Sequence, residues 1–115
     1  MKVLRITLLA ALSLSAAQGA QTFTGIIVDD MCAGVGHAPM RMGPTDAECT
    51  RACVLSHGAA YVLEVGKDIY TLSDQTAPAE FAAQKVRVVG TLDARTRTIR
   101  VASISSATDA ATDAR

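Results

Sequence analysis

Apolar and β-branched residues recur along the chain in five short stretches, which glycine, proline and polar residues separate. In the fourth stretch Val86, Val88 and Leu92 occupy alternate positions, which is the period of a β-strand with one buried face. Gly66-Lys67 lies between the second and third stretches and predicts a hairpin with a tight turn. The predicted strands are 22–28, 60–65, 68–73, 85–92 and 97–104.

The segment between the first two predicted strands has a different pattern. Residues 31–44 contain three glycines and two prolines, which predicts an irregular loop. Thr45 and Glu48 then form a capping-box sequence, in which the threonine oxygen accepts from the Glu48 N–H and the glutamate reaches back. A helix is therefore predicted over 46–57, with Gly58 as its left-handed stop.

An alanine-rich segment at 77–84 predicts a second, short helix between strands three and four. Five strands with a helix in that place follow the chain order of the OB-fold, a partly open Greek-key barrel. Gly25 and Gly90 lie inside predicted strands, where a bulge or bend lets a sheet coil and close. We expect a mainly β, five-stranded OB-like Greek-key barrel, with the 46–57 helix inserted between strands one and two. The alternative is an open antiparallel sheet packed on one helix.

The first twenty residues have the features of a secretory signal peptide, in the usual order. Lys2 and Arg5 precede an apolar run, and small residues follow as far as Ala20. The apolar run is about a dozen residues at most, too short to span roughly 30 Å of hydrocarbon as a helix. We expect residues 1–20 to be cleaved and the mature protein to be secreted or periplasmic, with no membrane attachment.

The remaining chain of about 95 residues has the length of one domain, which we place at 21–104. From residue 105 the sequence consists largely of serine, threonine, alanine and aspartate, and Ala-Thr-Asp-Ala occurs twice in succession. Such a segment has too little apolar surface to bury, so residues 105–115 are predicted to be a disordered tail.

Charge and aromatic content argue against a nucleic-acid partner. Removing Lys2 and Arg5 from the eleven basic residues leaves nine against eleven acidic ones, a net charge of −2. Nucleic-acid binders usually carry a basic patch and aromatic residues on which bases stack. The chain has two phenylalanines, two tyrosines and no tryptophan. A protein or a small ligand is the expected partner class.

The unusual chemistry of the chain lies in three cysteines and two histidines. Their spacing is Cys32-x4-His37-x11-Cys49-x3-Cys53-x3-His57. Cys49 and Cys53 are four residues apart and face the same way on the predicted helix. Cys32 and His37 come from the preceding loop, which can fold back over that helix. Convergence of Cys32, His37, Cys49 and Cys53 would give a tetrahedral Cys₃His metal site.

Two metals suit such a site. Zinc is bound in proteins by thiolate and imidazole ligands in this number. Copper(I) is the other candidate, because Met31, Met40 and Met42 lie in the same loop and thioethers favour it. We expect Met40 and Met42 to pack in the loop and His57 to interact with the last carbonyls of the helix.

The alternative to a metal is a disulfide. An exported chain meets oxidising conditions, and Cys32 paired with Cys49 or Cys53 would join the loop to the helix. The closed loop has about 17 to 21 residues and stabilises the fold by about 3 kcal/mol in the chain-entropy treatment. One thiol is then left over, which leaves a thiol redox function as a third hypothesis.

Other residue patterns give weaker signals. Asp29 and Asp30 are adjacent carboxylates at the end of a predicted strand, and we expect a solvated turn there. Cys53 with His57 resembles a nucleophile with its base, but Cys53 lies mid-helix, far from the positive helix start that lowers a thiol pKa. No Ser-His-Asp set is present in the barrel segment, so we expect no enzymatic activity.

Gly-Ile-Ile-Val-Asp-Asp-Met-Cys at 25–32 and Glu-Cys-Thr-Arg-Ala-Cys-Val at 48–54 occur together with related segments at 58–63, 70–72 and 88–92. Together they resemble a group of small exported bacterial proteins with a domain of unknown function, over roughly residues 22 to 104. The resemblance implies export, a small β-barrel and no particular activity. It also implies a characteristic segment between the first two strands, carried here by Met31, Cys32, His37, Cys49, Thr50, Cys53 and Val54.

The sequence thus leads to a non-enzymatic exported module that binds zinc or copper through Cys32, His37, Cys49 and Cys53. The alternative function is a disulfide-stapled module that binds a protein or ligand without a metal, through an open barrel face or a strand edge.

Overall fold

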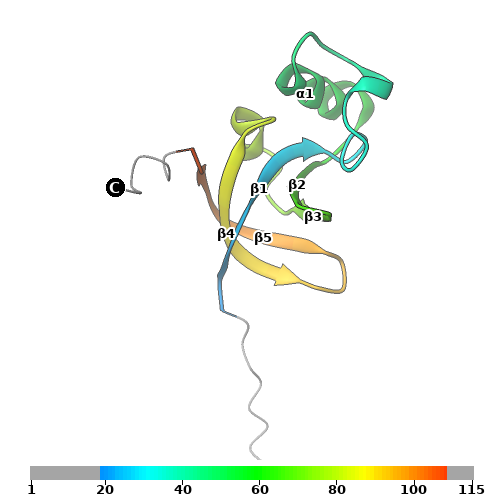
Figure 1. The fold of residues 1–115 in the computed structure, drawn as a ribbon. Helices are drawn as coiled ribbons and strands as arrows, with labels where there is room; N and C mark the ends of the chain where they lie inside the picture. Colours follow the sequence, from blue (N-terminus) through cyan, green and yellow to red (C-terminus); the bar gives the residue numbers. More distant parts are fainter. Residues whose placement is uncertain (1–18, 109–115) are drawn as a thin grey trace, which may run out of the picture.

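The computed structural model describes residues 19–108, in which one helix lies beyond the end of a set of curved strands (Figure 1). The predicted signal peptide, except for its last two residues, and residues 109–115 of the predicted tail lie outside the described residues. The elements are β1 (Gln21–Asp29), α1 (Asp46–His57), β2 (Tyr61–Val65), β3 (Asp68–Leu72), β4 (Lys85–Asp93) and β5 (Thr98–Ser106), with 3₁₀ turns η1 (Ala38–Met40) and η2 (Ala77–Phe81).

The five strands close into a barrel in the order β1-β2-β3-β5-β4, with β4 returning to β1. All neighbouring pairs are antiparallel except β3 and β5, which pair in parallel through Thr71 with Thr98 and Leu72 with Ile99. The prediction of a mainly β fold with five strands and a helix between the first two is confirmed. Closure of the sheet distinguishes it from the alternative of an open sheet packed on one helix.

The barrel interior is filled by aliphatic side chains at alternate positions of the strands. Val86 and Val88 are both fully buried, as the period-two pattern of β4 predicts. Tyr61 begins β2 in the same core, and the Gln75 side chain accepts from its N–H and donates to its carbonyl. The buried members of this core are Ile27, Tyr61, Leu63, Leu72, Val86, Val88 and Ile99.

Two glycines allow strands to approach closely enough for closure. A Cβ atom on Gly25 would lie 2.3 Å from the Glu64 carbonyl oxygen, and one on Gly90 would lie 2.3 Å from that of Arg100. The β4–β5 register shifts between Val89 and Gly90, which confirms the predicted irregularity at Gly90. The strand curvature that positions the barrel ends therefore depends on these two sites.

Two predicted segments differ in the structure. β5 continues to Ser106, because Ser105 and Ser106 pair with Arg87 and Val86 of β4, so the predicted disordered tail begins too early. The alanine-rich segment is a short 3₁₀ turn over Ala77–Phe81 and not a longer helix. Among the described residues, no helix has the length and apolar character needed to cross a membrane.

Candidate metal site

The helix that carries two of the candidate ligands begins and ends where the sequence predicts. The Thr45 hydroxyl oxygen accepts from the Glu48 N–H at 3.2 Å, and the same hydroxyl donates to the Glu48 carboxylate at 2.9 Å. Gly58 adopts a left-handed conformation, with φ of +68°, and its N–H bonds to the Cys53 carbonyl. These local signals fix α1 at Asp46–His57 and set which residues face the barrel.

The buried face of α1 consists of Cys49, Thr50 and Cys53, each fully excluded from solvent. Both sulfurs pack with Val28 of β1 and Val62 of β2 in a second apolar cluster, outside the main barrel core. Positions 49 and 53 are one helical turn apart, so both side chains point at the same end of the barrel. The helix therefore presents two thiols to the β1 strand end.

Tight turns after β1 bring Cys32 against the same helix. The Asp29 carbonyl accepts from the N–H groups of Cys32 and Ala33, at 3.2 and 3.0 Å. Asp29 Oδ1 also accepts from the N–H groups of Met31 and Cys32, at 3.1 and 3.0 Å. Cys32 is only 2% exposed. The carboxylate of Asp29 thus holds the turn that positions the Cys32 thiol.

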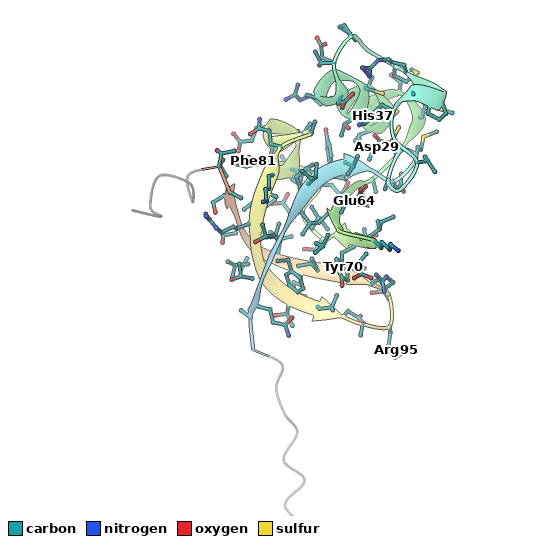
Figure 2. The ribbon with its side chains drawn as sticks, viewed as in Figure 1. Asp29, His37, Glu64, Tyr70, Phe81 and Arg95 are labelled. Atoms are coloured by element: carbon teal, nitrogen blue, oxygen red, sulfur yellow. The ribbon has the colours of Figure 1, made fainter. Side chains whose placement is uncertain are left out.

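His37 follows two left-handed glycines, Gly34 and Gly36, whose positive φ angles reverse the chain direction. It precedes the η1 turn, and its Nδ1 atom is buried. Figure 2 shows His37 in the loop beside α1 and Asp29 at the end of β1 that faces the helix.

The side chains form two overlapping groups of possible metal ligands. Ligand atoms of Cys32, His37 and Cys49 all lie within 4.8 Å of one another, and so do those of Asp29, Cys32 and Cys53. Cys32 belongs to both groups. These distances are close enough for a metal ion to draw the donors together, since zinc lies about 2.0 to 2.3 Å from nitrogen, oxygen and sulfur ligands.

Two polar atoms in these groups are buried and have no hydrogen-bond partner among the described residues. They are Asp29 Oδ2 and His37 Nδ1. Burial of a polar atom without a partner costs free energy, about 1–3 kcal/mol for a neutral group and more for a charged one. One such atom in each ligand group indicates that both groups have donors available for a cation.

Burial also raises the pKa of two thiols, those of Cys32 and Cys53. Desolvation, followed by the nearby Asp29 carboxylate, raises the pKa of Cys32 to about 12. The same two causes raise the pKa of Cys53. In the absence of a metal these thiols therefore keep their protons at neutral pH, and they are poor nucleophiles.

All four predicted ligands, Cys32, His37, Cys49 and Cys53, are thus brought together, although in two overlapping groups and not in one set of four. His57 is exposed at the end of α1 and belongs to neither group. The loop methionines are partly exposed, at 39% for Met31, 45% for Met40 and 37% for Met42.

Asp29 is a ligand candidate that the sequence reasoning missed. The expectation of a solvated turn holds for Asp30, which is exposed, and is wrong for Asp29, which is fully buried. The signal was the spacing Asp29-x-x-Cys32, which after a strand end allows the carboxylate to cap the turn that carries the thiol.

The three cysteines are free thiols in this structure. No protein-family model, characterised protein or solved structure matches the chain.

Proposed function

We propose that this protein is an exported, non-enzymatic β-barrel module that binds a zinc or copper ion through Cys32, His37, Cys49 and Cys53. The observation that carries the proposal is the meeting of the buried Cys32 and Cys49 thiols, from the loop and the helix, with the imidazole of His37. Thiolate and imidazole donors are the set that zinc and copper(I) prefer in proteins.

The energetics of the metal-free cluster support this proposal. Two buried thiols, Cys32 and Cys53, lie beside the buried Asp29 carboxylate, and Cys32 and the third thiol, Cys49, lie beside the His37 imidazole. A bound cation would displace the thiol protons and give the buried donor atoms a partner. Metal binding would therefore also stabilise the fold. A chain of this size buries only about two-thirds of its unfolded surface, so such a contribution is significant.

The proposal also covers the fold type of the protein and its localisation. The strand order β1-β2-β3-β5-β4 and the parallel pairing of β3 with β5 support an OB-like Greek-key assignment. The resemblance to small exported bacterial proteins supports the same domain type. The features of residues 1–20 support secretion or periplasmic delivery.

The second candidate function is a disulfide-stapled interaction module without a metal. It is favoured by one observation, the proximity of the Cys32 sulfur to those of both Cys49 and Cys53. Oxidation would join Cys32 to one of them and leave the other as a free thiol.

The mass of the exported protein separates the two functions. Native mass spectrometry of protein purified without chelators should show one bound zinc or copper ion, and denaturation should give three free thiols. A mass about 2 Da lower than the reduced chain, with no ion, would instead establish the disulfide.

Substitutions then identify the ligands. Cys32→Ser should cause the largest loss of metal affinity, because Cys32 belongs to both ligand groups. His37→Ala should weaken binding, whereas His57→Ala is the matched control and should bind as the unmodified protein does, because His57 lies outside both groups. Equal effects of the two histidine substitutions would exclude His37 as a ligand.

A further inference from the structure

The buried carboxylate of Asp29 has no cation partner among the described residues. The ion pairs of residues 19–108 are Arg41 with Asp46 and Arg97 with Asp68, and both lie on the surface. A fully buried carboxylate is rare unless it is paired with a cation or coordinates a metal. Asp29 is fully buried, and within residues 19–108 its carboxylate is held by backbone N–H groups and not by a cation, so a metal ion is a chemically suitable partner for it.

The two carboxylate oxygens of Asp29 have different roles. Oδ1 accepts from the Met31 and Cys32 N–H groups, which fixes the orientation of the side chain. Oδ2 is buried and has no hydrogen-bond partner within residues 19–108. A carboxylate oxygen of Asp29 lies within 4.8 Å of both the Cys32 and Cys53 sulfurs. The turn thus fixes the carboxylate beside the two thiols and leaves Oδ2 without a hydrogen bond among the described residues.

We infer that Asp29 is an additional metal ligand and that it makes the site selective for Zn²⁺ over Cu⁺. This inference rests on the proposed function, because it assigns a further residue to the same metal cluster. It goes beyond the Cys₃His set, which contains no oxygen ligand.

The chemical basis is the difference between the two ions. Zn²⁺ accepts carboxylate oxygen at about 2.0 to 2.2 Å together with thiolate and imidazole. Cu⁺ selects thiolate and thioether ligands and gains little from a carboxylate. The methionines whose thioethers would favour Cu⁺ are 37–45% exposed, whereas the thiols and the Asp29 carboxylate are buried. An oxygen donor in the buried group therefore adds affinity for Zn²⁺ and much less for Cu⁺.

The test compares two neighbouring aspartates. Asp29→Asn keeps an oxygen that can accept from the Met31 and Cys32 N–H groups, but it replaces the free carboxylate oxygen with an amide. Asp30→Asn is the matched control, because Asp30 is exposed and its recorded contact is with the Ala60 N–H. Affinities for Zn²⁺ and for Cu⁺ are measured separately, by competition with chromophoric chelators and under anaerobic conditions for Cu⁺.

The expected result is a loss of Zn²⁺ affinity of about 100-fold in Asp29→Asn, at the upper end of what a perturbed ligand environment causes. Its Cu⁺ affinity, and both affinities of Asp30→Asn, should match those of the unmodified protein. Equal Zn²⁺ affinity in the two variants, or equal losses for Zn²⁺ and Cu⁺ in Asp29→Asn, would overturn the inference and leave the proposed function intact. If the unmodified protein binds neither ion, the proposed function fails as well.

A measurement on the unmodified protein covers the case in which Asp29→Asn does not fold. Carboxyl carbon NMR resolves the Asp29 and Asp30 side chains during a Zn²⁺ titration. Ligation predicts that the Asp29 resonance moves to a new position with one equivalent of Zn²⁺, while that of Asp30 stays in place. An unmoved Asp29 resonance at full Zn²⁺ occupancy would exclude ligation.

Discussion

The backbone N–H of Met42 donates a hydrogen bond to the sulfur of Cys49, with an N···S distance of 3.3 Å. The Cys49 thiol in turn lies 3.5 Å from the carbonyl oxygen of Met40, to which it donates. The loop between β1 and α1 therefore contacts a candidate ligand through its backbone. Contacts of this kind around metal ligands orient them and adjust their affinity.

The first prediction follows from Gly43, which packs against the first turn of α1. A Cβ atom there would lie 2.9 Å from the Glu48 Cβ and 3.1 Å from the Cys49 nitrogen. Gly43→Ala should therefore displace the loop, break the bond from Met42 to Cys49 and lower Zn²⁺ affinity about ten-fold. Chelator competition measures the effect.

Met42→Leu is the control for Gly43→Ala. It keeps the backbone N–H of residue 42 and removes the thioether, so Zn²⁺ affinity should not change. A loss in Met42→Leu as large as that in Gly43→Ala would show that the methionine sulfur itself contributes to zinc binding, and the loop-packing explanation would be wrong.

The second prediction concerns the helix cap. Thr45→Ala removes the hydroxyl that bonds both the N–H and the carboxylate of Glu48. Loss of such a cap costs about 1 kcal/mol. The free energy of unfolding, measured in urea, should fall by that amount. Thr96→Ala, in the exposed turn between β4 and β5, should change it by less than about 0.5 kcal/mol.

The third prediction tests barrel closure. Gly25→Ala places a Cβ where the Glu64 carbonyl oxygen now lies, and backbone atoms cannot move aside as a flexible side chain can. We expect a loss of about 3 kcal/mol in the free energy of unfolding. Thr24→Ala, at the exposed neighbouring position of β1, should cost less than about 1 kcal/mol. Similar midpoints of urea unfolding for the two variants would contradict the close strand approach.

The sequence predicted best those features that neighbouring residues determine. Thr45, Glu48 and Gly58 fix the ends of α1 locally, and the helix has the predicted bounds. The glycine at position 90 marks a register shift because no side chain fits there. The meeting of loop and helix ligands was also predicted, since Cys49 and Cys53 share a face and the glycine-rich loop can reverse its direction.

Features that depend on distant partners were missed. Asp29 is buried because α1 packs over the end of β1, and a pair of aspartates alone carries no sign of that packing. β5 extends to Ser106 because Ser105 and Ser106 pair with residues of β4, although the serines themselves have no apolar surface to bury. The sharing of Cys32 by two ligand groups likewise follows from the turn geometry at Asp29, which spacing does not specify.

The fourth prediction is a loss of stability of the metal-free protein in alkaline solution. Burial and the Asp29 carboxylate raise the pKa of Cys32 from 9.0 to about 12, so the folded state favours the protonated thiol. The resulting stabilisation is fully present below pH 9 and is lost as the pH rises toward 12, because the unfolded chain releases the proton first. Burial also raises the pKa of Tyr61, which acts in the same direction.

Urea unfolding of the metal-free protein between pH 9 and 12 measures how the free energy of unfolding changes with pH. Cys32→Ala is the control, because it has no thiol to titrate at that position. The variant should lose less stability between pH 9 and 12 than the unmodified protein does. With zinc bound, the free energy of unfolding should instead fall as the pH falls, because protons compete with the ion for the deprotonated thiols. Identical alkaline slopes in both proteins would mean that the Cys32 thiol is not shielded from water, and the buried cluster would have to be reconsidered.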